Sequence, residues 1–200
     1  SILAALLSPA LKTVREKAKQ IACMNNLKQV GVALIMYADE NNGWSPPIYH
    51  DMGGWGYFWH DYLRGKYLHQ FVNGGPSVLI CPSNQPRIFI TGQPGYTYGF
   101  RGMWGDNYTA EVCHSIGVDC KTYMPAIPWT SPSSEPSAFL IVADSYSPGH
   151  GNQWYYFDIF ATTTTFFVRA SHSGIANGLF ADGHVTALPP TQLTNYVARY

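Results

Sequence analysis

A long helical pattern at the start of this 200-residue chain constrains its fold more than any other feature. Between residues 3 and 39, apolar side chains recur every three or four positions, which predicts one long helix with a single buried stripe. The stripe contains Leu11, Val14, Ala18, Ile21, Met24, Leu27, Val30, Leu34 and Tyr37. At about 1.5 Å per residue the helix would be roughly 50 Å long, so we expect its first turns to project from the rest of the molecule.

Two local signals modify this helix. Pro9 lies inside the pattern and predicts a kink or local melting, because proline lacks an N–H and clashes with the preceding turn. The run Asn41-Asn42-Gly43 predicts the end of the helix, with Gly43 available as a left-handed cap.

After Gly43 the pattern changes to short apolar bursts separated by Gly and Pro. We expect a short helix at 63–71 and strands at 78–80, 87–90, 138–143, 155–160 and 166–169. Two further strands flank Asp182-Gly183, which predicts a hairpin with a two-residue type I′ turn. The predicted class is α+β: a long N-terminal helix (residues 1–40) packed on an antiparallel sheet with long irregular loops, in a globular β-rich head domain (residues 41–200).

The composition is neutral and rich in aromatic residues. Twelve basic residues balance twelve acidic ones, so no net charge directs the chain toward nucleic acid. Charged residues are 12% and aromatic residues 15% of the chain. This suits a protein packed against copies of itself, although an ordinary secreted β-rich domain has a similar composition.

The four cysteines form no C-x-x-C pair, which argues against a zinc knuckle or a thioredoxin-type site. Their even number favours an oxidising compartment. We expect a disulfide between Cys113 and Cys120, which enclose a short polar loop, and then one between Cys23 and Cys81 by elimination. The alternative is that Cys23 is a buried thiol on the helix.

The chain opens in the middle of an apolar run that no helix-start signal precedes. Six apolar residues cannot span a bilayer, which needs about 20, so we interpret the run as the tail of a longer hydrophobic segment. An exposed apolar helix end requires a partner, and stacking such ends along an axis gives contacts that do not close, hence a helical filament. The expected assembly residues are Ile2, Leu3, Leu6, Leu7, Pro9, Leu11 and Val14.

Motifs at both ends of the chain resemble one known family. Residues 7–43, from Leu-Ser-Pro-Ala-Leu to Glu-Asn-Asn-Gly, resemble the N-terminal helix of type IV pilins and type II secretion pseudopilins. His172, nine further residues and then Asp182-Gly183 resemble the prepilin-type branch with that C-terminal motif. The segments Cys81-Pro-Ser, Tyr96-Thr-Tyr-Gly and Ile141-Val-Ala-Asp-Ser also fit the resemblance.

The resemblance implies a precursor anchored in the inner membrane by its apolar helix, which later forms the core of a pilin-like filament. Its implied partners are copies of itself, other pilins or pseudopilins and the assembly machinery, and its implied location is extracellular or at the cell surface. No nucleic acid is expected as a partner.

The C-terminal motif also permits chemical interpretations. His172 and Asp182, with Asp144 as a third member, suggest a catalytic set, but no G-x-S-x-G nucleophile motif occurs and we expect no enzyme. The favoured interpretation is structural, with His172 hydrogen-bonded to the hairpin turn or to a buried carboxylate. We expect no cofactor. Calcium held by Asp144 and Asp182 with Asp158 is the open alternative, since pseudopilins of related type often hold calcium in a C-terminal loop. A zinc site from His150, His172 and His184 is a weaker option.

Two surface features remain open. The aromatic run from Trp55 to Tyr62 suggests a sugar-stacking platform, although burial against the long helix is the favoured interpretation. Asn107-Tyr-Thr109 matches the N-glycosylation pattern. The leading functional prediction is therefore a filament subunit, and the alternative is a surface adhesin or carbohydrate-binding minor pilin.

Overall fold

The computed structural model describes residues 2–51, 56–69, 74–84, 87–90, 93, 95–102, 123–124, 136–158 and 167–197. Within these ranges, only the backbone is described for residues 2–6, 51, 102, 123–124, 158 and 194–197.

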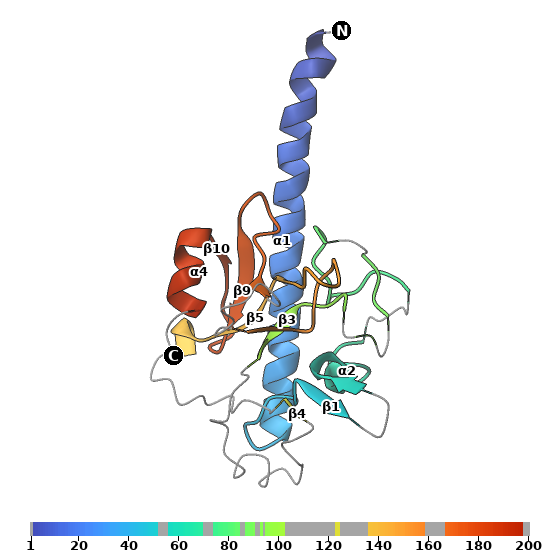
Figure 1. Cartoon of the computed structure of the whole chain (residues 1–200), viewed down its shortest axis with the longest axis vertical. Coiled ribbons are helices and arrows are strands. Elements are labelled where there is room, and N and C mark those ends of the chain that lie inside the picture. The colour runs from blue at the N-terminus through green and yellow to red at the C-terminus, as the bar shows by residue number, and fades with distance from the viewer. Residues whose placement is uncertain are drawn as a thin grey trace.

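Helix α1 runs without interruption from Ile2 to Glu40, and its N-terminal part projects well beyond the rest of the chain (Figure 1). The predicted long helix is therefore confirmed. Of the kink or local melting expected at Pro9, the melting is wrong: the helix continues on both sides, and the Thr13 hydroxyl donates to the Pro9 carbonyl over 3.1 Å. Among the described helices, none combines the length and the hydrophobicity needed to cross a membrane.

The C-terminus of α1 is closed by a left-handed turn. The Gly43 N–H donates to the Ala38 carbonyl at 2.8 Å, which is the long bond of a Schellman motif. Asn42, with φ of 55°, precedes Gly43 in the left-handed region, so the cap begins one residue earlier than predicted.

Helix α1 carries two apolar faces rather than the predicted single stripe. Cys23, Leu27, Val30 and Leu34 are fully buried against the head. Six other large apolar side chains of α1 are exposed, at Leu7 (61%), Leu11 (52%), Val14 (63%), Ile21 (52%), Val32 (59%) and Met36 (46%). With about 3.6 residues per turn, these exposed residues share one side of the helix, roughly opposite the buried face. We call them the outer stripe.

The head is built on a five-stranded sheet with the order β10-β9-β5-β3-β7. Its strands are β3 (Gly99–Gly102), β5 (Leu140–Ala143), β7 (Tyr156–Asp158), β9 (Ala176–Phe180) and β10 (Val185–Leu188). Neighbouring strands are antiparallel except β3 and β7, which pair in parallel from Phe100–Tyr156 onward. The α+β class is confirmed, while the sheet is mixed rather than wholly antiparallel.

Smaller elements surround this sheet. A second sheet has the order β2-β1-β4, and β6 pairs with β8. Their bounds are β1 Tyr49–Asp51, β2 Gly56–Phe58, β4 Tyr123–Met124, β6 Ser145–Tyr146 and β8 Phe167–Val168. The short helices are α2 Trp59–Leu63, α4 Pro190–Val197 and the 3-10 turn Pro136–Ala138.

Several predicted short elements are wrong. The helix expected at 63–71 is wrong where the structure describes it: α2 ends at Leu63, the backbone becomes extended at Arg64 and left-handed at Gly65, and residues 64–69 are not helical. Residues 78–80 and 87–90 form no strand. Phe89, in the second segment, forms an isolated bridge with Gly75.

The five-stranded sheet is covered on both faces. Helix α1 packs on β9 and β10 (Figure 1), and it approaches β9 closely at Gly31, where an added Cβ would lie 2.8 Å from a Leu179 methyl. Side chains alternate along a strand, so Phe180 points to the other face, where it joins a cluster with Leu140 and Phe157. Leu193 of α4 packs against that cluster.

The hairpin between β9 and β10 has a three-residue loop rather than the predicted type I′ turn. The Gly183 N–H donates to Phe180 O at 2.9 Å, and the Phe180 N–H donates to His184 O at 3.0 Å. Gly183 has a φ of 84°, whereas Asp182 is not among the left-handed residues that a type I′ turn would require. The Asp182 carboxylate accepts the His184 N–H at 3.1 Å, which stabilises this loop.

Two valines of α1 test the assignment of its faces. Val30→Ala should lower the free energy of unfolding by about 2 kcal/mol, because it removes two buried methyl groups and leaves a cavity. Val32→Ala is the matched control on the exposed side and should change it by less than about 0.5 kcal/mol. Urea denaturation followed by circular dichroism measures both; equal effects would contradict the assignment.

Candidate functional site

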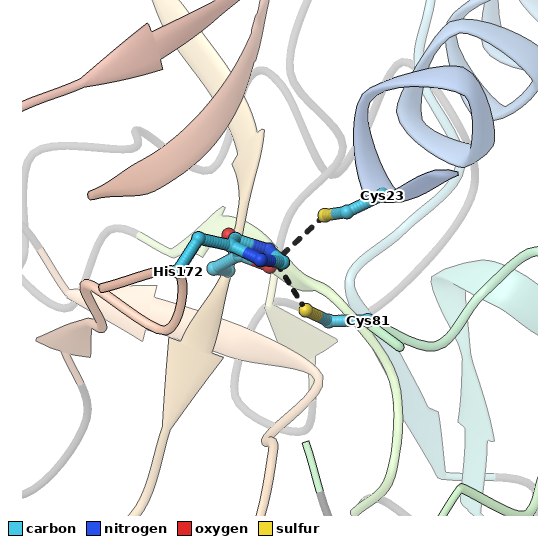
Figure 2. Close-up of side chains that lie close together, drawn as sticks. Cys23, Cys81 and His172 are labelled. Atoms are coloured by element: carbon cyan, nitrogen blue, oxygen red, sulfur yellow. Dashed lines mark hydrogen bonds and ion pairs between the residues drawn. The ribbon is translucent and has the colours of Figure 1, made fainter. Parts of the chain in front are cut away.

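Four chemically reactive side chains from separate parts of the chain meet in the core. They are Cys23 on α1, Cys81, Asp144 between β5 and β6, and His172 in the turn before β9. All four are buried, and one ligand atom from each lies within 4.8 Å of the other three. Figure 2 shows the His172 ring pointing toward the two cysteine side chains.

The contacts inside this cluster are short. The Cys81 Sγ lies 3.2 Å from His172 Nε2, and the Cys23 thiol donates to Asp144 Oδ1 over 3.4 Å. The second carboxylate oxygen, Asp144 Oδ2, lies 3.5 Å from His172 Nε2. The two sulfurs, the imidazole nitrogen and the carboxylate therefore face one common point.

Neighbouring groups fix the orientation of His172 and Asp144. The Ser83 hydroxyl oxygen lies 3.1 Å from His172 Nδ1, which leaves Nε2 directed at the cluster. The Asn177 N–H donates to Asp144 Oδ2 at 2.8 Å. Both ends of the pair are thus positioned by hydrogen bonds from outside the cluster.

The two cysteines are positioned in the same way. The hydroxyl of the fully buried Tyr98 donates to Cys23 Sγ at 3.2 Å. The Cys81 backbone N–H donates to the Gln153 side-chain oxygen at 3.0 Å, which fixes the segment that carries the second sulfur.

The pKa values of the groups in the cluster are shifted in different directions. Burial lowers the pKa of His172, but hydrogen bonds and charge from Asp144 and Cys23 outweigh it and raise that pKa to about 9. Burial raises the pKa of the Cys81 thiol. Burial also acts to raise the pKa of Cys23, but hydrogen bonds from Cys81, His172 and Tyr98 lower it overall. The site therefore pairs a cationic imidazole with a carboxylate and one acidified thiol.

A tight turn presents His172 to the cluster. Backbone hydrogen bonds join His172 and Ile175 in both directions, at 2.9 and 3.2 Å. Ser173 and Gly174 between them have φ of 53° and 88°, which is the pattern of a type I′ turn. The type I′ turn predicted at Asp182-Gly183 thus occurs at the other end of β9.

The two halves of the C-terminal motif have different environments. His172 precedes β9 and contacts the buried carboxylate of Asp144, which is one of the two structural interpretations derived from the sequence. Asp182 and Gly183 lie beyond the other end of β9, in the exposed hairpin loop. There the Asp182 carboxylate contacts His184 Nδ1 at 2.5 Å, so Asp182 and His172 form no catalytic pair.

The metal ligands predicted from sequence are not brought together. The Asp144 N–H donates to Asn177 O, so Asp144 lies beside Asn177 of β9. Asp182 comes five residues after Asn177, which at the usual rise per residue places it roughly 10 Å or more from Asp144. The side chain of Asp158 is outside the described residues. His150 stacks on Trp154 with ring centroids 3.8 Å apart, whereas His184 contacts the hairpin loop, so neither joins His172.

The structure contains Cys23 and Cys81 as free, buried thiols, so the predicted disulfide between them is not formed. Cys23 and Cys81 nevertheless meet in the core. Cys113 and Cys120 lie outside the described residues, as do Asn107 and Thr109 of the glycosylation pattern.

The aromatic run is largely buried where the structure describes it. Trp59 is fully buried, and its indole N–H donates to Tyr155 O at 2.9 Å. Phe58 and His60 are also buried, while Tyr57 is exposed; Trp55 is outside the described residues. Helix α2 contacts α1, so the interpretation as packing against the long helix agrees with the structure.

The predicted assembly residues lie on the projecting part of α1. Leu7, Leu11 and Val14 are exposed, and Pro9 lies within the helix. Ile2, Leu3 and Leu6 belong to the same helix, but their side chains are outside the described residues.

One comparison with known proteins gave a match. Residues 12–70 match the model of a family described as a protein of unknown function, DUF1559. That family is associated with pilin-like, prepilin-type proteins. The match covers most of α1 and includes Cys23, but it ends before Cys81, Asp144 and His172. No curated protein and no solved structure matches the chain.

Replacing His172 tests the contribution of the cluster. His172→Ala leaves the buried Asp144 carboxylate without its imidazole partner, which should cost about 3 kcal/mol or more. For a chain of this size that lowers the melting temperature by roughly 6–12 °C. Calorimetry or circular dichroism measures the shift.

His184→Ala is the control, because its side chain also contacts a carboxylate but is 41% exposed. It should change stability by no more than about 0.5 kcal/mol. If His172→Ala has the same melting temperature as His184→Ala, the cluster does not stabilise the fold.

Proposed function

We propose that this chain is a structural subunit of an extracellular filament of the type IV pilus or pseudopilus kind, assembled through α1. The observation that carries this proposal is the outer stripe, which stays exposed along a helix that projects from the head. The pilin-like association of the family that matches residues 12–70 supports the same assignment.

The outer stripe is costly for a subunit on its own. Leu7, Leu11, Val14 and Ile21 each expose more than half of their surface. Burying one such side chain contributes about 1.5–3 kcal/mol, so four of them can stabilise association by several kcal/mol before the entropy cost. A stripe of this length is therefore best explained by a partner that covers it.

Copies of the same chain suit this role. Between residues 7 and 21, Lys12, Glu16 and Lys19 lie on the other side of the helix, so this part of the outer stripe contains no charged residue, and the whole chain is neutral. Helices packed side by side through such a stripe, each offset from the next, form a heterologous contact that extends into a filament. Other pilins or pseudopilins with a similar helix are compatible partners.

The proposal includes the route by which relatives of this type reach the surface. The precursor is held in the inner membrane, and the assembly machinery then transfers the subunit to the filament. A structural rather than catalytic role is supported by the burial of His172, which is 2% exposed and lies among side chains of the core. A sugar-binding role has less support, because Trp59 is buried.

A charge placed in the outer stripe tests the proposal. Val14→Asp should reduce filament formation at least about tenfold, because a carboxylate would have to be buried between subunits. Its melting temperature should stay within about 2 °C of the wild type, since Val14 is 63% exposed. Filaments sheared from cells are counted by electron microscopy.

Thr13→Asp is the matched control, since it adds the same charge to the neighbouring exposed position outside the stripe. It should assemble like the wild type. Normal filaments from Val14→Asp, or equal loss from both variants, would contradict assembly through this stripe.

A further inference from the structure

We propose that Cys23, Cys81, Asp144 and His172 form a structural Zn²⁺ site that links α1 to the head. The site is formed by the cluster alone and does not depend on the proposed filament function. It differs from the metal sites predicted from sequence, which used Asp182 or the histidines at 150 and 184.

The donor set is that of zinc. Two thiolates, one imidazole and one carboxylate are ligands that Zn²⁺ takes in four-coordinate protein sites, and soft sulfur donors disfavour Ca²⁺ and Mg²⁺. With bonds of about 2.3 Å to sulfur and about 2.0–2.1 Å to nitrogen and oxygen, tetrahedral geometry places neighbouring donors roughly 3.3–3.8 Å apart.

The observed donor separations lie within or just below this range. Cys81 Sγ to His172 Nε2 is 3.2 Å, Cys23 Sγ to Asp144 Oδ1 is 3.4 Å, and Asp144 Oδ2 to His172 Nε2 is 3.5 Å. With all the donor atoms within 4.8 Å of one another, small side-chain rotations suffice to close the shell.

The groups around the donors resemble the outer shell of a zinc site. A zinc-bound histidine normally uses its other ring nitrogen to bind an oxygen, as His172 Nδ1 does with Ser83. Tyr98 donates to the Cys23 sulfur, and the Asn177 N–H donates to the Asp144 carboxylate. The bonds from Tyr98 and Asn177 would each stabilise a negatively charged ligand.

The position of the site explains what the ion would do. Its ligands come from α1, the Cys81 segment, the end of β5 and the turn before β9, which are far apart in the sequence. One ion would therefore cross-link the long helix to three parts of the head. Because all four ligands are buried and protein atoms fill the coordination shell, the site is structural and leaves no open position for a substrate.

A disulfide between Cys23 and Cys81 would consume both sulfurs and exclude the ion, so the zinc-bound and disulfide-bonded states are distinguishable.

For the test, the whole chain is produced in zinc-containing medium and purified without chelator. Mass spectrometry of the metal content should give about one Zn²⁺ per chain. Exchange for Co²⁺ should give the thiolate-to-metal charge-transfer and tetrahedral d–d absorption bands of a sulfur-ligated ion.

Variants locate the ion. Cys81→Ser and His172→Ala should each weaken zinc affinity by more than about 100-fold, because losing an outer-shell group alone typically costs 10–100-fold. Tyr98→Phe should show that smaller, outer-shell loss. His184→Ala is the matched control outside the cluster and should keep full zinc content.

The wild-type protein decides the question even if a variant fails to fold. The proposal is overturned if the folded wild type carries no zinc, or if peptide mapping under non-reducing conditions recovers Cys23 and Cys81 in one disulfide-linked peptide. Full zinc content in both Cys81→Ser and His172→Ala would overturn it as well, since the ion would then lie elsewhere.

Discussion

The fold depends on the contact between one face of α1 and the sheet. From Cys23 to Leu34 this face is fully buried, and Gly31 allows the helix to lie directly on Leu179 of β9. No side chain larger than hydrogen fits at that position without displacing Leu179, so the packing distance is set by the backbone itself. The same face brings Cys23 to the centre of the head, where Asp144, His172 and Cys81 converge on it from three other segments.

Strong periodic signals predicted the long helix, its end near Asn41 and the two strands around Asp182-Gly183. These elements are governed by local backbone preferences, which a sequence displays directly. The division of α1 into two apolar faces was missed because both faces have the same three-and-four spacing. A repeat shows which residues share a side of a helix, but it does not show which side another segment covers, or where that cover stops.

The cluster was missed for a different reason. Its residues lie far apart in the sequence and carry none of the short spacings by which zinc sites are recognised. Strand β5 pairs with β9 beside Asn177, which brings Asp144 close to the turn that carries His172. Strand β9 also separates this turn from the loop at Asp182, so Asp182 does not join the cluster. One signal was available: Cys23 precedes Leu27 by one helical turn, on the face that became the core. The turn at Ser173-Gly174 was not predicted, because the Asp-Gly pair downstream is the more familiar turn signal. Ser173 and Gly174 occupy the two left-handed positions of the turn.

The continuity of α1 has a mechanical consequence. The projecting turns and the buried turns belong to one unbroken helix, so a pull on the outer half is transmitted along its backbone hydrogen bonds rather than absorbed at a hinge. The load first reaches the head at Glu16, whose carboxylate accepts a hydrogen bond from Ser83, and then at Cys23, where the helix meets three segments of the head together. Tension at this point is shared between the sheet and the loops instead of peeling a single strand from its edge. Helix α1 therefore acts as a rigid rod that is fixed at the point where it enters the head.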